Sequence, residues 1–338
     1  MSFPKPAAAP TLSDVAARAN VSKVTASSVL HKSRSNTRVS EATRQRILDI
    51  AAELKYRPNA VARSLRRQST SIIGFYCGHG LATAHNFFLS DVIGGLQEAC
   101  DEQRRDLLLH GAFHRRSVDD IFDELTNRTV DGLVLIAYAD DPLVERLRAS
   151  SLPVVALADA LPGLPSVVVD DAGGTRLLAE HLAARGHRRV YFRASEDALT
   201  SVARRHAALR DAAAAHGMTV VGTFPAGWRA PLGAGEMQCL ALPRGERPTA
   251  AVCWSDTSAY SVLTECRRLG LRVPEDLAVV GFDGIEPPME PLQRLTSVRA
   301  PWTEAARRAV ALLVDRIEGR DVPAETVLPV ELVEGDTT

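Results

Sequence analysis

From residue 71 onward, short apolar runs alternate with amphipathic stretches, and this alternation constrains the fold more than any other feature of the sequence. The first runs are SIIGFYC, DLLLHGAF, DGLVLIAY and PVVALA. Between them lie stretches with helical periodicity, such as 88–103 and 118–126. Strands that are apolar throughout are typical of parallel sheets that helices cover on both faces. The sequence therefore predicts a doubly wound α/β fold.

A second set of apolar runs follows the first. It begins with PSVVVD and continues with RVYFRA, MTVVGTF, TAAVCW and LAVVGFD. Two sets predict two lobes, with a ligand cleft between them at the carboxyl ends of the strands. Because periplasmic solute receptors share this architecture, the pattern predicts a ligand binder and leaves the class of protein open.

Several function classes are excluded by what the sequence lacks. It contains no G-x-x-x-x-G-K-[ST], G-x-G-x-x-G, H-E-x-x-H or G-x-S-x-G motif, so we expect no enzyme. Its five cysteines are scattered without C-x-x-C, which favours buried thiols in a reducing cytoplasm over disulfides or a zinc site. No apolar run approaches the ~20 residues of a membrane span, and no signal peptide precedes the first helix. We expect a cytoplasmic protein without a cofactor or metal.

The first 70 residues differ in charge from the rest of the chain. They hold 13 Lys and Arg against 4 Asp and Glu, a net charge of +9, whereas the remainder carries −10. A basic module on an acidic body is typical of a domain that binds a polyanion.

Residues 11–30 predict two short helices around a tight turn. Thr11 and Asp14 form a capping box, Asn20 suits the left-handed end of a helix, and Ser22 can cap the next one. The outer surface of the second helix is small, polar and basic, so this helix fits the major groove of DNA. The alternative is an ordinary three-helix bundle without such a role.

Two further helices follow in this region. One begins at the N-cap Ser40 and extends to about Lys55. Pro58 then separates it from a segment that Asn59 can cap and that ends near Arg66. With about seven residues, this segment is shorter than the ~12–15 at which isolated helices become marginally stable in water. We therefore expect another partner to stabilise it.

The motifs LSDVAARANVSKVTASSVLH and RVSEATRQRILDIAAELKYRPNAVARSL resemble the lactose-repressor/galactose-repressor family of bacterial regulators. The likeness extends to LPVEL near the end. It implies a helix-turn-helix head over 1–57, a hinge helix and linker over 58–70, and an effector-binding and dimerisation body like periplasmic binding proteins over 71–338. Lobe 1 is then about 71–169 and 299–325, and lobe 2 about 170–298 and 326–334. The implied crossings lie near Asp170, Val298 and Thr326.

The resemblance also assigns DNA-binding and effector-binding residues. Those expected to contact DNA are Lys23, Val24, Thr25, Ser27, Ser28, His31, Tyr56, Asn59, Leu65 and Arg66. Leu65 is the hinge leucine that enters the minor groove. Those expected at the effector are Phe88, Arg205, Trp228, Ser255, Asp283 and Trp302. A guanidinium suits vicinal hydroxyls and an indole suits the apolar face of a sugar, although core packing is the alternative for each tryptophan.

Several positions depart from the family pattern. His31 stands where the family usually has Asn, and Ser255 also replaces a usual Asn. Asp159 lies one residue late for the family's acidic ligand, and no proline precedes Phe88 and its neighbour Phe87. The departure at His31 leaves the operator sequence open, and the other three leave the effector open, with a sugar or sugar derivative as the first expectation.

The function expected from these observations is a sequence-specific transcriptional regulator, in particular a repressor of a catabolic or uptake operon. It would bind a pseudo-palindromic operator in double-stranded DNA and respond to a small molecule. A homodimer is expected, because no heptad tail follows the last predicted strand. The alternatives are a solute receptor without DNA function, which the basic head disfavours, and an enzyme, which the missing catalytic motifs disfavour.

Overall fold

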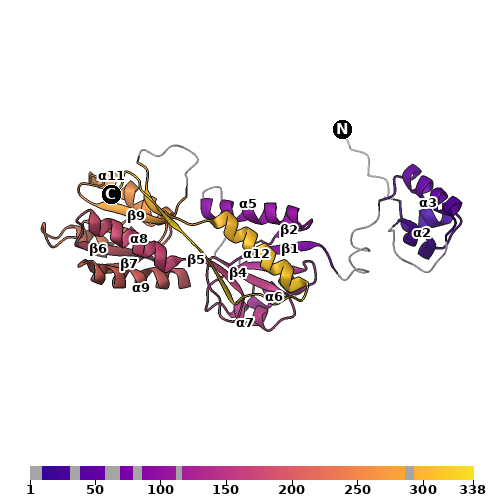
Figure 1. The fold of residues 1–338 in the computed structure, drawn as a ribbon, viewed down its shortest axis with the longest axis horizontal. Coiled ribbons are helices and arrows are strands. Elements are labelled where there is room, and N and C mark those ends of the chain that lie inside the picture. Colours follow the sequence, from indigo (N-terminus) through magenta and orange to yellow (C-terminus); the bar gives the residue numbers. More distant parts are fainter. Residues whose placement is uncertain (1–9, 31–38, 58–68, 79–85, 112–115, 286–292) are drawn as a thin grey trace. The chain divides into compact units, whose positions relative to one another are not determined.

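The structure is a computed structural model that describes residues 10–30, 39–57, 69–78, 86–111, 116–285 and 293–338. The chain divides into two compact units, Met1–Thr70 and Ser71–Thr338. The first unit is the head and the second is the body (Figure 1).

The described part of the head folds into α1 (Leu12–Arg18), α2 (Lys23–Leu30) and α3 (Glu41–Glu53). The predicted capping box is present, since the Asp14 carboxylate accepts from the Thr11 N–H at 2.8 Å and the Thr11 hydroxyl accepts from the Asp14 N–H. Asn20 has a φ of +52°, as the predicted turn requires. The helices enclose a small apolar core of Val15, Ala16, Ala19, Ala26, Val29, Ile47 and Ala51.

The first sheet of the body has six parallel strands in the order β11-β5-β4-β3-β1-β2. They are β1 (Ile72–Cys77), β2 (Asp106–Leu109), β3 (Gly132–Ile136), β4 (Val154–Leu157), β5 (Ser166–Val169) and β11 (Glu325–Leu328). Its helices are α5 (Phe87–Glu102), α6 (Val118–Thr126), α7 (Pro142–Arg148) and α12 (Trp302–Ile317). Side chains of β3 alternate between two cores: Val134 packs with α5 and α12, and Leu133 packs with α6 and α7. Helices therefore cover both faces of this lobe 1 sheet, as the apolar runs predict.

The second sheet has the order β12-β10-β9-β8-β6-β7. Its strands are β6 (Arg189–Ser195), β7 (Thr219–Ala226), β8 (Ala250–Cys253), β9 (Ala278–Asp283), β10 (Thr296–Arg299) and β12 (Glu331–Val333). Its helices are α8 (Asp171–Ala184), α9 (Thr200–Ala215), α10 (Ala234–Leu240) and α11 (Asp256–Leu269). In β6, Phe192 packs in the core with α8 and α9, whereas Tyr191 packs in the core with α11. This sheet and its helices form lobe 2.

Two sequence predictions about the lobes need correction. The sequence predicts PSVVVD as the start of the second set, but this run forms β5, which pairs with β4 and β11 inside lobe 1. The crossing predicted near Thr326 lies between Leu328 and Glu331, because all of β11 belongs to the lobe 1 sheet. The chain runs toward the crossing along β10 and away from the crossing along β12. These two neighbouring strands of lobe 2 are therefore antiparallel.

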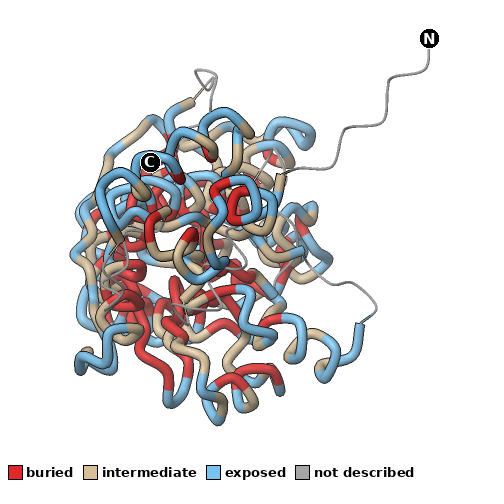
Figure 2. The backbone as a smooth tube through the Cα atoms, turned by 90° about the vertical axis from the view of Figure 1, so that its right-hand side faces the viewer, coloured by how far each residue is buried: buried red, intermediate tan, exposed pale blue. Residues whose placement is uncertain are grey.

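Along the described parts of the tube, buried residues alternate with exposed ones, as expected for elements that present one side to a core (Figure 2). Among the described residues, no helix has both the length and the apolar character that crossing a membrane requires.

Candidate functional site

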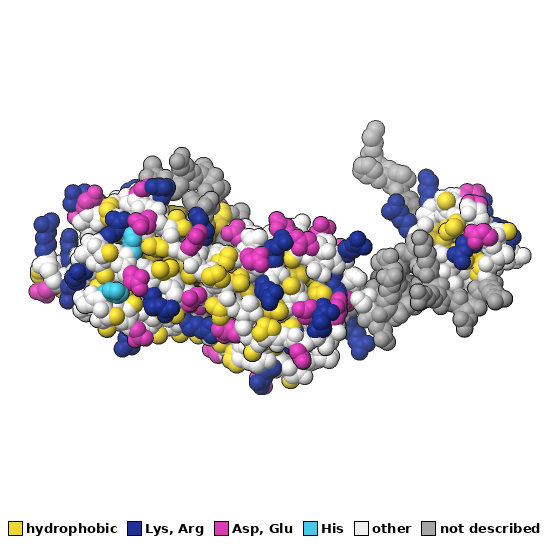
Figure 3. All heavy atoms as spheres, in the orientation of Figure 1, with side chains coloured by type: hydrophobic (Ala, Val, Ile, Leu, Met, Phe, Trp, Pro, Cys, Tyr) yellow, Lys and Arg dark blue, Asp and Glu magenta, His cyan; other side chains and the backbone are white. Residues whose placement is uncertain are grey.

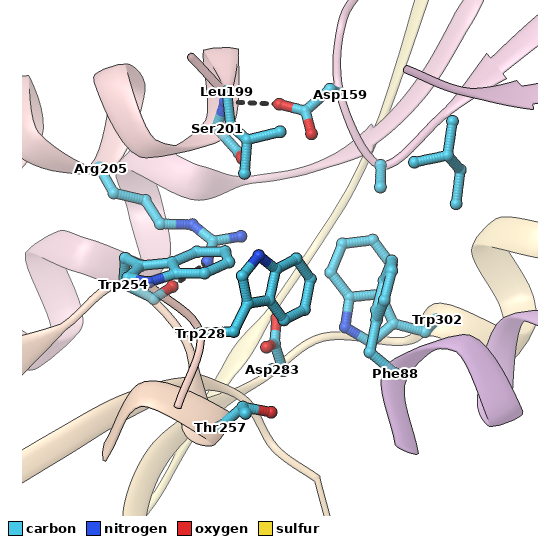
Figure 4. A pocket seen from close by; sticks show the side chains of 12 residues that line it. Phe88, Asp159, Leu199, Ser201, Arg205, Trp228, Trp254, Thr257, Asp283 and Trp302 are labelled. Carbon is cyan, nitrogen blue, oxygen red and sulfur yellow. Dashed lines mark hydrogen bonds between the residues drawn. The ribbon is translucent and has the colours of Figure 1, made fainter. Parts of the chain in front are cut away.

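A pocket lies between the two lobes at the carboxyl ends of their parallel strands (Figure 4). It encloses about 500 Å³ of atom-free space out to its mouth, within the range of small-molecule sites. Residues that follow or end β3, β4, β8 and β9 contribute, together with the first turns of α5, α9, α11 and α12. The lining residues are Phe88, Ile136, Ala158, Asp159, Leu199, Ser201, Arg205, Trp228, Trp254, Thr257, Asp283 and Trp302.

Five of the six predicted effector residues meet in this pocket, and Ser255 does not. Ser255 is the N-cap of α11, and its hydroxyl accepts from the Ser258 N–H at 3.3 Å. The local sequence carries this capping function, since Ser is a preferred N-cap residue. Contrary to the prediction, Ser255 therefore holds the start of a helix and does not line the pocket.

Arg205 is held on several sides by other groups of the protein. Its Nε donates to Asp171 Oδ1 at 2.7 Å, and its Nη1 donates to the Trp254 carbonyl oxygen. The guanidinium lies over the Phe282 ring, 3.5 Å from the centroid. The family resemblance assigns both Arg205 and Asp283 to the effector, and the structure adds a buried ion pair between Arg205 and Asp171. That contact joins α9 to the first turn of α8, 34 residues away.

Buried carboxyl groups surround the guanidinium. Burial raises the pKa of Asp171, and Arg205 opposes this rise. Burial likewise raises the pKa of Asp283 well above its usual value, again against the attraction of Arg205. Next to them, burial raises the pKa of Asp256 to about 6, although the Ser297 hydroxyl and the Ile285 N–H stabilise its charged form. The guanidinium of Arg205 is therefore a single cation among several buried acids, of which Asp283 also lines the pocket.

Aromatic rings form the apolar part of the pocket (Figure 4). Phe88 meets Trp302 edge-on with centroids 4.8 Å apart, and Trp228 meets Trp254 edge-on at 5.1 Å. Trp228, Trp254 and Trp302 are all the tryptophans of the chain. Sequence reasoning missed Trp254, although its position at the end of the apolar run TAAVCW places it at the carboxyl end of β8.

Asp159 lies one residue late for the family's acidic ligand, yet it lines the pocket. It follows Ala158, whose φ of +74° redirects the chain at the end of β4. Its Oδ1 accepts from the Ser201 N–H at 2.8 Å and from the Thr200 hydroxyl at 2.9 Å. Asp159 of lobe 1 thus caps α9 of lobe 2, a helix whose own N-cap residue, Leu199, makes no side-chain cap.

Positive φ also occurs at Asp283, with a value of +127°. Non-glycine residues rarely adopt such angles, and they cluster at functional sites where the surrounding structure enforces them. Ala158 and Asp283 end strands of different lobes and face the same pocket. This supports a binding role for the pocket.

In the head, α2 presents the predicted DNA-contacting surface. Lys23 and Val24 are exposed, Val24 to 70%. Thr25 shares the cap of α2, since its hydroxyl lies 2.8 Å from that of Ser22. Ser27 and Ser28 are half-buried.

Tyr56, also predicted at DNA, is half-buried against the head core, and its N–H donates to the Ala51 carbonyl oxygen at 2.8 Å. The remaining predicted DNA contacts lie outside the described residues: His31, Asn59, Leu65 and Arg66.

The described surface of the body carries interspersed charges of both signs on the face in view (Figure 3). Within the described part of the chain, no group of His, Cys, Asp and Glu is arranged to hold a metal ion. A helix-turn-helix head joined to a two-lobed body with an inter-lobe pocket defines the class of ligand-responsive DNA-binding regulators.

Comparisons with known proteins agree with this class. Residues 11–59 match the model of bacterial regulatory proteins of the lacI family, and residues 179–338 match a periplasmic binding protein-like domain. The transcriptional repressor PurR of Aliivibrio fischeri is 30% identical over 92% of this chain and 93% of its own length. A transcriptional regulator of Mycolicibacterium smegmatis is 31% identical over 99% and 98%, respectively.

Solved structures show the same likeness. The Lac repressor dimer bound to operator and the anti-inducer ONPF superposes with a TM-score of 0.80, at 26% identity over 97% of this chain and 98% of that one. A CelR–cellobiose complex gives a TM-score of 0.67, at 28% identity over 97% and 100%. The chain therefore belongs to the lacI family of bacterial regulatory proteins. It is a DNA-binding transcriptional repressor of that family and not an enzyme.

Proposed function

We propose that this repressor acts in the cytoplasm as a homodimer on a pseudo-palindromic operator of a catabolic or uptake operon. A neutral, polyhydroxylated small molecule in the inter-lobe pocket would set its affinity for that operator. The observation that carries the proposal is the convergence of three tryptophans, one guanidinium and two carboxyls, those of Asp159 and Asp283, on one pocket. Aromatic faces and charged hydrogen-bonding groups are what a sugar ring requires.

The charge balance favours a neutral effector over an acid or a phosphorylated sugar. Asp171 already compensates the charge of Arg205 at 2.7 Å. Asp159 and Asp283 add two carboxyl groups to the lining, and burial raises the pKa of Asp283, which favours its protonated form. An anionic ligand would face these acids, whereas a hydroxyl can donate to them and accept from the guanidinium. The ligands of two structural relatives, ONPG and cellobiose, are neutral sugars.

DNA recognition is assigned to the head and the segment after it. The exposed first turn of α2, with Lys23 and Val24, would enter the major groove. By the family resemblance, Leu65 and Arg66 would occupy the minor groove at the centre of the operator. Because a two-fold dimer reads two half-sites, the operator would be pseudo-palindromic.

Selecting the DNA duplexes that the full chain binds from a random pool would identify the operator. Titration of that operator with salt should show a steep loss of affinity, because each neutralised phosphate releases about 0.9 counterion. Equal binding to all sequences at physiological salt would refute the proposal for the head.

The effector can be found by fluorescence, since every tryptophan of the chain lines the pocket. Cellobiose, ONPG and related neutral sugars would be compared with uronic acids and sugar phosphates. We expect a saturable change in tryptophan emission with a neutral sugar, and a matching change in operator affinity. A response confined to the anionic ligands would refute the neutral-effector proposal.

A further inference from the structure

Trp228 lies on the segment that follows β7, outside any helix or strand. Its ring stands between Trp254 on one side and the pair of Phe88 and Trp302 on the other (Figure 4). The contact with Trp254 is edge-on, with an interplanar angle of 89°. The indole also has a polar partner, which restricts how the ring is turned.

Asp197 is this partner. The Trp228 Nε1–H donates to Asp197 Oδ2 across 3.3 Å. Asp197 is itself held in the short connection between β6 and α9, where its N–H donates to the Ser195 hydroxyl at 3.1 Å and its carbonyl accepts from the Leu199 N–H at 2.9 Å. The carboxylate is therefore at a defined position behind the indole, and it is not part of the pocket lining.

The same carboxylate reaches lobe 1. Tyr138 follows β3 and is packed against the apolar core with its hydroxyl toward Asp197. Burial is the main cause that raises the pKa of Tyr138, and the charge of Asp197 and a hydrogen bond to it raise the pKa further. Tyr138 belongs to lobe 1, whereas Asp197 and Trp228 belong to lobe 2. One side chain thus joins an effector-facing ring to the opposite lobe.

We propose that Asp197 is a positioning residue that couples the orientation of the Trp228 indole to the approach of the two lobes through Tyr138. When the lobes are together, Asp197 accepts hydrogen bonds from both partners, and the indole has one orientation at the pocket. When the lobes separate, Tyr138 leaves and the carboxylate is free to turn with Trp228. A ligand that requires the fixed indole would therefore favour the closed body, which is the differential affinity that allosteric control needs.

The test uses the full chain labelled with 5-fluorotryptophan, which gives one ¹⁹F resonance for each of three tryptophans. Single Trp→Phe variants assign the resonances. We expect Asp197→Ala to shift or broaden the Trp228 resonance by more than its linewidth. Tyr138→Phe, which removes only a hydroxyl on the other lobe, should move the same resonance. Asp197→Asn should restore it, because the amide oxygen accepts from the indole and the amide N–H can donate to the tyrosine oxygen.

Asp211→Ala is the matched control, since Asp211 is an exposed carboxylate on α9 of the same lobe. It should leave all three resonances in place. The proposal would be overturned if Tyr138→Phe left the Trp228 resonance unchanged, or if the resonance in Asp197→Asn did not return to its wild-type position. The inference rests on the pocket of the proposed function, but this measurement needs no effector. Its failure is therefore distinguishable from a failure of the proposed function.

Discussion

Replacing Arg205 with methionine should destabilise the body strongly, independently of any effector. The side chains of Arg205 and Asp171 are 5% and 2% exposed and make a hydrogen-bonded ion pair. Removing one member of a buried pair leaves the other charge uncompensated and typically costs about 3–5 kcal/mol. At roughly 2–4 °C per kcal/mol for a domain of this size, the melting temperature should fall by about 6–20 °C.

The double variant Arg205→Met/Asp171→Leu separates stability from ligand binding. Apolar residues of similar volume often replace a buried pair without loss, so the double variant should melt near the wild type. It should nevertheless fail to respond to the effector that changes wild-type tryptophan emission, since it lacks the guanidinium. The wild type, the single variants Arg205→Met and Asp171→Leu, and the double variant form a double-mutant cycle. Each protein would be melted in a calorimeter and titrated with the effector. Additive losses of stability, or a double variant with full effector response, would refute this role of Arg205.

Three further predictions concern other parts of the chain. Leu65→Ala should weaken operator binding by at least tenfold, about 1.4 kcal/mol, with little change on scrambled duplexes; equal affinity of both proteins in gel shifts would contradict this. Arg204→Glu should lower the stability of the body by ~0.2–1 kcal/mol, and by less at high salt, because the ion pair of Arg204 with Glu325 joins the lobes at 2.9 Å but is about 40% exposed. The exchanged pair Arg204→Glu/Glu325→Arg should recover the lost stability, and a loss in melting experiments that does not depend on salt would argue against the pair. Burial raises the pKa of Asp256 in the folded state to about 6, from 3.8 for an exposed aspartate. Between about pH 4 and 6 the folded state therefore keeps a proton that the unfolded state has lost, so the free energy of unfolding should fall as pH rises through that window. Asp256→Asn should flatten this slope, and an unchanged slope would assign the effect to other groups.

Much of the fold could be predicted because its determinants are local. The capping box of Thr11 and Asp14 involves atoms three residues apart, and its geometry is as predicted. The apolar runs also predicted the strands, since burial on both faces requires apolar side chains at successive positions. What the runs could not decide was the sheet to which a strand belongs. By its apolar run alone β5 looks like the start of a second set, whereas the family resemblance and its pairing with β4 and β11 place it in lobe 1.

The pocket shows the same division. The family resemblance names Arg205, Trp228 and Asp283 for one site, and all three line the pocket. It could not determine the partner of Arg205, since that contact depends on how α8 and α9 pack. Sequence reasoning also left Asp159 out of the site. Alignment with the family counts residues along the chain, and such counting takes no account of the positive φ at Ala158, which changes where the next side chain points. The sequence thus determines which side chains occur and how they are spaced. Which buried charges pair with one another depends on how the helices pack and on the backbone angles at strand ends, so only the tertiary structure decides it.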